Sequence, residues 1–238
     1  MKNIILIGAS SGIGEALAFE LGKRGYTLGL IARREELLLA IKTKLSSPCF
    51  VKKADAEKHD EIRQAVADLA AEMGGADCII YNAGIGESSG KWEKENQMHQ
   101  VNMIGFAAIA NWSFNYFVKE KKEGQIVGIS SVAGTRGMRH AIGYSAGKAF
   151  MWNYMEGQRH KAIAEKLPIT ITDIRPGFID TPMTKGQKGM FWVQPASKAA
   201  YQIANAIENK KGIVYVTKRW TIIGKIFAMV PDFIWNKL

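Results

Sequence analysis

The chain has 238 residues, 47% of them hydrophobic, and a formal net charge of +10. This length and composition allow one sizeable core and do not require a second domain. The basic residues are scattered and no nucleic-acid motif accompanies them, so we interpret the charge as a solvated surface and expect no nucleic-acid partner. Cys49 and Cys78 match no metal-ligand spacing, and we therefore expect neither a metal site nor thiol chemistry.

The first residues of the chain bear on its location in the cell. A single Lys2 and a short apolar run over residues 4–7 precede the first glycine. This run is too short for a signal sequence, so the sequence favours a cytoplasmic protein.

Strand-like and helix-like segments alternate along the chain. Short apolar runs predict seven strands, at residues 3–7, 27–32, 49–53, 78–82, 125–130, 169–174 and 213–216. Helical periodicity predicts helices at residues 12–25, 34–45, 57–73, 93–117, 144–166 and 195–209. The alternation predicts a single-domain, doubly wound α/β fold with a parallel seven-stranded, Rossmann-like sheet over residues 1–216. An amphipathic tail of the same domain then follows over residues 217–238.

The expected fold tells us where to look for function. In doubly wound sheets, ligands bind beyond the carboxyl ends of the strands, near the point where the strand order reverses. Functional residues should therefore follow strands directly. The longest irregular stretch, residues 176–194, comes after the sixth strand and is the candidate for a substrate lid.

A glycine-rich loop leaves the first strand and opens the first helix. Its sequence is Gly8-Ala9-Ser10-Ser11-Gly12-Ile13-Gly14. Glycines there let the backbone turn sharply and approach a pyrophosphate, which the free N–H groups and dipole of the helix N-terminus stabilise. The glycine spacing differs from the commoner dinucleotide pattern, and the loop lacks the Gly-Lys-Ser or Gly-Lys-Thr ending of the ATPase loop.

The end of the second strand indicates which dinucleotide the loop would hold. An enzyme specific for NAD often carries a carboxylate there, on the ribose 2'-hydroxyl, but this chain has Ala32, Arg33 and Arg34. An arginine forms charge-assisted bonds to a 2'-phosphate, and cationic charge is otherwise disfavoured at a helix N-terminus. We therefore expect NADPH to be preferred over NADH, with Arg33 at the phosphate and a further bond from Ser10 or Ser11.

Tyr144 and Lys148 form the candidate catalytic pair. Their four-residue spacing places them on one face of a helix, where their side chains can meet. Proton transfer near neutral pH requires a tyrosine whose pKa lies well below its usual value of about 10. A neighbouring ammonium, together with the positive nicotinamide in the oxidative direction, would lower that pKa.

Several short motifs share an order along the chain and a placement at strand ends. They are Gly8 to Gly14 after the first strand, Asp55 after the third, Asn82-Ala83-Gly84 after the fourth, Asn102 in the next helix, Ser131 after the fifth, Tyr144-Ser145-Ala146-Gly147-Lys148, and Pro176 to Thr181 after the sixth. In these motifs the chain resembles the short-chain dehydrogenase/reductase family over residues 2 to about 216. The resemblance implies a carbonyl/alcohol oxidoreductase, and the arginines after the second strand favour NADP as its cofactor.

The resemblance also implies a role for each catalytic residue. Tyr144 would donate the proton when a carbonyl is reduced and remove it when an alcohol is oxidised. Lys148 would bind the nicotinamide ribose, and Asn102 would hold a water that relays protons to Lys148. Ser131 would hydrogen-bond the substrate oxygen, with Ser130 as its only rival.

The family resemblance also implies a set of cofactor contacts. Asp55 would contact the adenine, Asn82 to Gly84 would line the groove, and Ile179 and Thr181 would bind the carboxamide. The full set of expected cofactor residues is Gly8, Ser10, Ser11, Gly12, Ile13, Gly14, Arg33, Asp55, Asn82, Ala83, Gly84, Tyr144, Lys148, Pro176, Gly177, Ile179 and Thr181.

Three positions depart from the family's usual pattern, and two other function classes compete. Ile7, Tyr81 and Gly147 replace a threonine, an asparagine and a serine without removing a chemical role.

Residues 143–147 also fit a serine-hydrolase elbow, but no strand precedes them and no suitable acid and histidine follow, so we reject that interpretation. A non-catalytic dinucleotide sensor is the other alternative, and turnover would exclude it.

The tail and the lid bear on the binding partners of the protein and on its substrate. Residues 218–235 are basic and aromatic but are interrupted by Lys225 and Pro231, so they are too short and too broken to span a bilayer. The tail either packs on the protein or a partner subunit, or lies on a membrane surface. Apolar lid residues favour a hydrophobic carbonyl or alcohol substrate, and the resemblance suggests a homodimer or homotetramer through helices 93–117 and 144–166.

Overall fold

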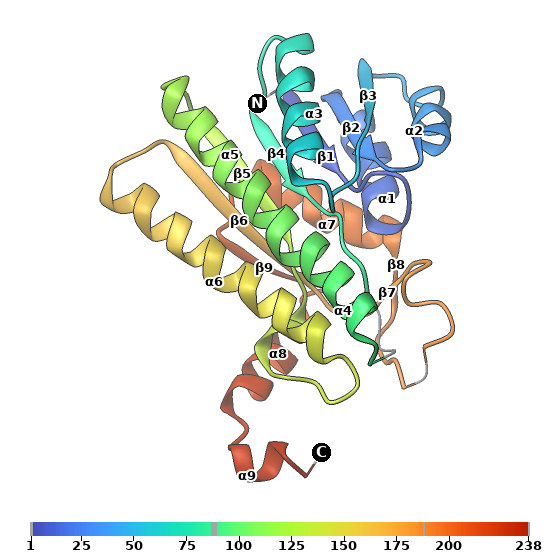
Figure 1. Cartoon of the computed structure of the whole chain (residues 1–238), viewed down its shortest axis with the longest axis vertical. Coiled ribbons are helices and arrows are strands. Elements are labelled where there is room, and N and C mark those ends of the chain that lie inside the picture. The colour runs from blue at the N-terminus through green and yellow to red at the C-terminus, as the bar shows by residue number, and fades with distance from the viewer. Residues whose placement is uncertain (1, 87–89, 188, 238) are drawn as a thin grey trace.

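Seven parallel strands form one sheet in the computed structural model, which describes residues 2–86, 90–187 and 189–237. The strand order is β3-β2-β1-β4-β5-β6-β9. The strands are β1 (Asn3–Ile7), β2 (Thr27–Ala32), β3 (Cys49–Lys53), β4 (Cys78–Tyr81), β5 (Gly124–Ile129), β6 (Ile169–Pro176) and β9 (Ile213–Val216). The order reverses between β1 and β4, so the predicted doubly wound, Rossmann-like sheet is confirmed (Figure 1).

The sheet is covered by helices on both faces, because its strands are apolar on both sides. Along β1, Ile4 and Leu6 join one buried cluster while Ile5 and Ile7 join the other, as the alternation of side chains along a strand requires. One face packs against α1 (Gly12–Lys23), α2 (Glu35–Lys42) and α7 (Ala196–Glu208), and the other against α3 (His59–Glu72), α5 (Phe106–Lys119) and α6 (Ile142–Ala164). Figure 1 shows α5 and α6 in front of the sheet and α7 behind it.

The predicted helix over residues 93–117 is wrong as one regular helix. It consists of α4 (Trp92–His99), a π-helical segment (Gln100–Gly105) and α5. The wider turn is held by the Tyr81 hydroxyl, which donates to the Val101 carbonyl oxygen at 2.6 Å. A Cβ on Gly105 would lie 2.4 Å from the Ala56 carbonyl oxygen, so this segment needs glycine to approach the sheet so closely. Such local bulges leave the apolar periodicity almost unchanged and often occur at functional sites.

Two short strands close the base of the predicted lid. β7 (Ile179–Asp180) pairs with β8 (Gln194–Pro195), so the chain between them leaves and re-enters the body at one place. Residue 188 of this lid lies outside the described residues, as do residue 1 of the main part and residue 238 of the tail.

The tail forms two helices that project from one end of the molecule (Figure 1). They are α8 (Trp220–Met229) and α9 (Asp232–Trp235). Arg136 binds Asp232 at 2.6 Å, and the Trp235 indole N–H donates to the Gly137 carbonyl oxygen at 3.0 Å. The tail is therefore attached to the loop that follows β5. Over the described part of the chain, no helix has the length and hydropathy needed to cross a membrane.

Candidate active site

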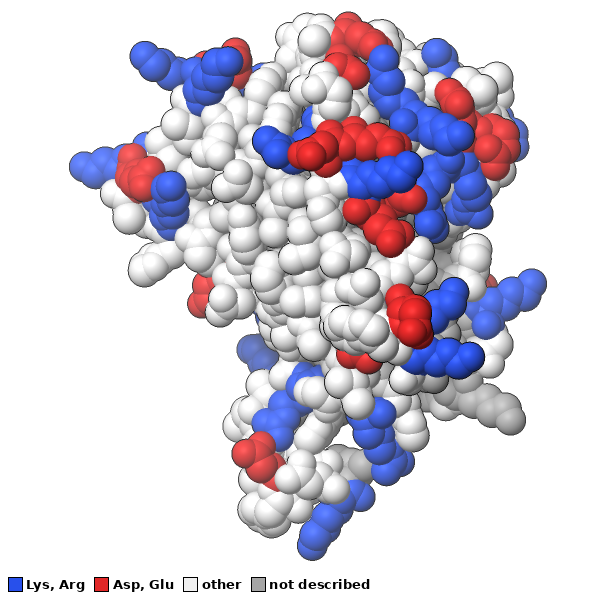
Figure 2. Space-filling view, viewed as in Figure 1, with Lys and Arg blue, Asp and Glu red and all other residues white. Residues whose placement is uncertain are grey.

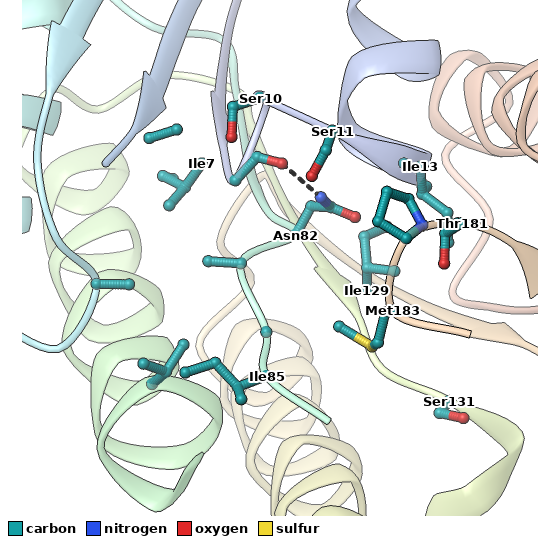
Figure 3. A pocket seen from close by; sticks show the side chains of 18 of the residues that line it. Ile7, Ser10, Ser11, Ile13, Asn82, Ile85, Ile129, Ser131, Thr181 and Met183 are labelled. Atoms are coloured by element: carbon teal, nitrogen blue, oxygen red, sulfur yellow. Dashed lines mark hydrogen bonds between the residues drawn. The ribbon is translucent and has the colours of Figure 1, made fainter. Parts of the chain in front are cut away.

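One cavity of about 230 Å³ opens at the carboxyl ends of the strands, where the order reverses between β1 and β4. In Figure 3, Ser10 and Ser11 lie toward one end of this cavity and Ser131 toward the other. All the site residues expected from the sequence line it except Gly14 and Asn102. The structure therefore brings together, around one cavity, residues that lie as far apart in sequence as Gly8 and Thr181.

The glycine loop brings the backbone against the end of β4. A Cβ on Gly8 would lie 2.5 Å from the Ala83 nitrogen, and one on Gly14 would lie 2.0 Å from the Gly8 carbonyl oxygen. The Asn82 amide nitrogen donates to that same carbonyl oxygen at 2.8 Å, as drawn in Figure 3. Only glycine fits these two positions, so the loop is shaped by close packing of backbone, which leaves the N-terminus of α1 facing the cavity.

The two arginines after β2 have different partners. Arg34 donates from Nη2 to the Ser10 hydroxyl oxygen at 3.0 Å and to the Ser11 hydroxyl oxygen at 2.9 Å. Arg33 lies 4.0 Å from Asp55, and both arginines line the cavity. We expected Arg33 at the phosphate, but Arg34 is the arginine that bonds to both serines. The sequence offered Arg34 as the second arginine after the second strand, but it did not show which of the two faces the serines.

Tyr144 and Lys148 lie on α6 at the other end of the cavity. The Lys148 ammonium nitrogen lies 5.6 Å from the centre of the Tyr144 ring and donates to the Ile129 carbonyl oxygen at 2.9 Å. Burial lowers the pKa of Lys148 to about 8, against an opposing effect of the Asp173 carboxylate.

The pKa of Tyr144 moves in the direction opposite to the one expected. Burial raises it, while the contact with the Ser131 hydroxyl acts against that rise. The expected lowering by the lysine is therefore not found in the protein alone, because desolvation of the phenolate is the larger effect.

The two candidate serines are separated by their hydrogen bonds. The Ser130 hydroxyl donates to an Asp173 carboxylate oxygen at 2.5 Å and accepts from the Trp152 indole at 3.0 Å. Ser131 accepts a bond from the Ala133 N–H at 3.1 Å and contacts Tyr144. The hydroxyl of Ser130 is thus engaged in a buried network, which favours Ser131 as the serine that meets a substrate.

Asn102 lies behind the cavity wall in the π-helical segment and is fully buried. The Ile85 N–H donates to its Oδ1 at 2.9 Å, and its Nδ2 donates to the Ile85 carbonyl oxygen at 2.8 Å. A Cβ on Gly84 would lie 3.4 Å from the Asn102 Oδ1 and 3.6 Å from the Lys148 Nζ. Both polar ends of the amide are therefore occupied in holding the chain after β4 against Lys148.

A buried ionic network beneath the site was not expected from the sequence. Asp173 lies in the middle of β6 and accepts a bond from the Arg175 Nε at 2.6 Å. The Arg175 guanidinium lies 3.5 Å from the centre of the Trp152 ring. Burial raises the pKa of Asp173 against the opposing effect of Arg175. The only signal in the sequence is an acid and a base two residues apart within an apolar run, which places both on one face of the strand.

The lid residues divide between the cavity and the tail. Met183 lines the cavity, and the Thr184 hydroxyl fastens the turn by donating to the Ile179 carbonyl oxygen at 2.7 Å. Phe191 and Trp192 of the lid form aromatic contacts with Trp220 at centroid distances of 5.0 and 6.2 Å. The tail is therefore part of the support of the lid.

Comparison with known proteins places this site in a family. A model of the short chain dehydrogenase family matches residues 2–190. An uncharacterized oxidoreductase of Mycobacterium tuberculosis is 31% identical over 222 residues, which are 89% of this chain and 86% of that protein. A hydroxysteroid 11-beta-dehydrogenase 1-like protein of Xenopus tropicalis is 27% identical over 224 residues, which are 89% of this chain and 77% of that protein.

A solved structure shares the fold. It is an alcohol dehydrogenase from the archaeon Thermococcus sibiricus in complex with 5-hydroxy-NADP, with a TM-score of 0.75 and 21% sequence identity over 90% of this chain and 95% of that one. The family match spans the loop, the tyrosine-lysine pair and part of the lid. The resemblance seen in the motifs is confirmed: this chain belongs to the short-chain dehydrogenase/reductase family of carbonyl/alcohol oxidoreductases, which act on small-molecule substrates and are commonly oligomeric.

Proposed function

We propose that this protein interconverts a carbonyl and an alcohol with NADP(H), and that Tyr144 exchanges the proton. The observation that supports this most strongly is the convergence of Ser131, Tyr144 and Lys148 on the same cavity as the glycine loop. A loop built to approach a phosphate and a tyrosine beside a serine hydroxyl are both needed for this reaction. A sensor would need only the loop.

The residues at the loop end of the cavity suit NADPH. The close backbone packing at Gly8 and Gly14 turns the N-terminus of α1 toward the cavity, where a diphosphate would bind. Arg34 with Ser10 and Ser11 supplies donors for a 2'-phosphate. When bound, the nicotinamide supplies the hydride, which is chemistry that no side chain here provides. We therefore expect Arg34 to contribute more to the preference for NADPH over NADH than Arg33 does.

The chain's own residues would move the proton and stabilise charge. Ser131 would hydrogen-bond the substrate oxygen while Tyr144 donates its hydroxyl proton to the same atom as the carbonyl is reduced. Lys148, with a pKa of about 8, is close enough to Tyr144 to stabilise a phenolate once the proton has left. Asn102 would act as a positioning residue, because both polar atoms of its side chain bond to Ile85.

The surroundings of the cavity indicate the substrate, the assembly and the location. Ile85 and Met183 are among its lining residues, so we propose a hydrophobic carbonyl or alcohol. We also propose a homodimer or homotetramer through α5 and α6. The unpaired thiols of Cys49 and Cys78 suit a reducing compartment such as the cytoplasm.

The proposal is tested by measuring NADPH and NADH oxidation against a panel of hydrophobic ketones, aldehydes and quinones. We expect turnover with at least one of these classes and a higher kcat/KM for NADPH. NADPH binding without turnover of any substrate would support the sensor instead. Faster turnover with NADH would contradict the cofactor assignment while leaving the reaction class intact.

A further inference from the structure

The exposed face of α8 carries apolar side chains that the proposed chemistry does not use. Ile222, Ile226 and Met229 follow the spacing of one helix face and are 63%, 49% and 81% exposed. Phe233 and Ile234 of α9, at the same projecting end of the molecule, are also exposed. Together these five side chains are called the tail face. Most large apolar side chains of a helix that packs only on its own protein would be covered, so a partner is implied.

The opposite side of α8 is firmly attached to the body. A Cβ on Gly224 would lie 2.6 Å from the Tyr215 ring, and the Phe227 ring packs against Trp235 at a centroid distance of 5.3 Å. Trp220 is buried against the lid. The helix cannot turn its tail face inward without losing this packing, so the exposed apolar surface is a stable property of the fold.

The charge of the tail indicates what kind of partner the tail face would bind. Lys218, Arg219, Lys225 and Lys237 belong to the tail, and its one acidic residue, Asp232, is paired with Arg136. In Figure 2 the projecting end of the molecule carries Lys and Arg side chains beside uncharged surface, with little acidic surface. Apolar side chains flanked by uncompensated basic ones match a bilayer that contains anionic headgroups, where both parts of the surface find partners.

A second copy of the chain fits this surface less well. A twofold dimer would place the same patch of each copy against the other. Lys225 lies within one turn of both Ile222 and Met229, so such a dimer would bring like charges together in an apolar interface. The tail face is also carried on a pair of helices that project from one end of the molecule (Figure 1).

We propose that the tail face binds the surface of an anionic lipid bilayer, with α8 lying in the headgroup region and the basic side chains on the phosphates. Because Trp220 joins α8 to Phe191 and Trp192, this binding would hold the lid side of the protein at the membrane. The proposal concerns where the protein lies and does not depend on the reaction that it catalyses.

The test is co-sedimentation of the full chain with vesicles of phosphatidylcholine alone and with added phosphatidylglycerol. We expect binding to the anionic vesicles, a loss of that binding at high salt, and much weaker binding to the neutral ones. The double variant Ile222→Ser/Ile226→Ser should bind the anionic vesicles about tenfold or more weakly. Lys225→Gln should bind about fivefold more weakly, since one basic residue near the surface is lost.

A matched control separates the tail face from exposed apolar surface in general. Leu39→Ser/Ile213→Ser changes two side chains that are 46% and 49% exposed on α2 and β9, outside the helices proposed to join subunits, and it should bind as the wild type does. Circular dichroism and the melting temperature check that each variant is folded. Equal binding by the wild type and the Ile222→Ser/Ile226→Ser variant, or no preference for anionic vesicles, would overturn the proposal.

Self-association provides the other decisive outcome. Light scattering would show whether the Ile222→Ser/Ile226→Ser variant forms a smaller oligomer than the wild type and the control variant do. We expect the same oligomeric state in all three. A smaller oligomer for the tail variant, together with no vesicle binding by the wild type, would assign the tail face to a second copy and contradict the membrane proposal.

Discussion

The guanidinium of Arg34 bonds to the hydroxyl oxygen of Ser11 at 2.9 Å, across the mouth of the glycine loop. This contact ties the end of β2 to the start of α1 and places a positive charge beside two hydroxyl groups. We predict that Arg34→Ala raises the KM for NADPH by about 10- to 100-fold, the value of one charge-assisted bond, and changes the KM for NADH little. Steady-state kinetics with both cofactors measure this.

Arg33→Ala is the matched control for Arg34. Arg33 has a longer contact, to Asp55, so we expect its loss to affect the NADPH KM less. Equal losses with NADPH and NADH in Arg34→Ala would show that the arginine shapes the loop and does not read the phosphate.

The buried Lys148 makes stability depend on pH in a defined window. Its pKa is about 8 in the folded protein and about 10.5 when unfolded, so between these values the unfolded chain binds more protons. The free energy of unfolding should therefore rise with pH from about 8 toward 10 by about 2–3 kcal/mol relative to Lys148→Met. Urea denaturation of both proteins at pH 7, 8, 9 and about 10 measures the difference.

Tyr144 sets the upper limit of that experiment. Its pKa is raised on folding, so its contribution to stability falls only above its unfolded value of about 10. Parallel pH curves for the wild type and Lys148→Met below this limit would mean that Lys148 is not a buried charge with a lowered pKa.

The Asp173–Arg175 pair supports the floor of the site. Both side chains are largely buried, and Asp173 also accepts the bond from Ser130. Asp173→Asn should lower the free energy of unfolding by about 3–5 kcal/mol, because the Arg175 charge is left without its partner. The double variant Asp173→Asn/Arg175→Met should be more stable than Asp173→Asn alone. Urea denaturation decides this, and additive losses would contradict a coupled pair.

The contact between Gly177 and Trp220 links the cavity to the tail. A Cβ on Gly177 would lie 2.0 Å from the Trp220 ring, while Gly177 itself lines the cavity. Gly177→Ala should cost about 1–3 kcal/mol of stability and loosen the tail, which limited proteolysis detects. Gly177→Ala/Trp220→Leu should recover part of the loss. A stable Gly177→Ala with an unchanged cleavage pattern would show that the tail does not depend on this contact.

Much of the fold was predictable, because it follows from local patterns. β1 alternates between two buried clusters, and β2, β3 and β9 have the expected bounds. The glycine loop was predictable because its glycines follow a strand directly, and Gly8 and Gly14 indeed have no room for a side chain. The grouping of the site followed from parallel strands, whose carboxyl ends meet at one edge.

The rest depends on contacts that local patterns do not carry. The π-helical segment arises where Gly105 meets Ala56 and Tyr81, which lie far from it in sequence. The assignment of Arg34 to the serines depends on how α2 begins, and two adjacent arginines look alike in a sequence. The Tyr144 pKa reflects burial, which the four-residue spacing to Lys148 does not reveal.

The most direct test of the proposed reaction is the kcat of Tyr144→Phe with NADPH and a substrate that the wild type reduces. The variant removes one hydroxyl and keeps the ring that packs in the cavity, so we expect NADPH to bind with nearly the same Kd, as measured by its fluorescence. The kcat should fall by a factor of about a hundred to ten thousand, because the proton donor is lost. A variant that binds NADPH and keeps the wild-type kcat would contradict the proton-donor role of Tyr144.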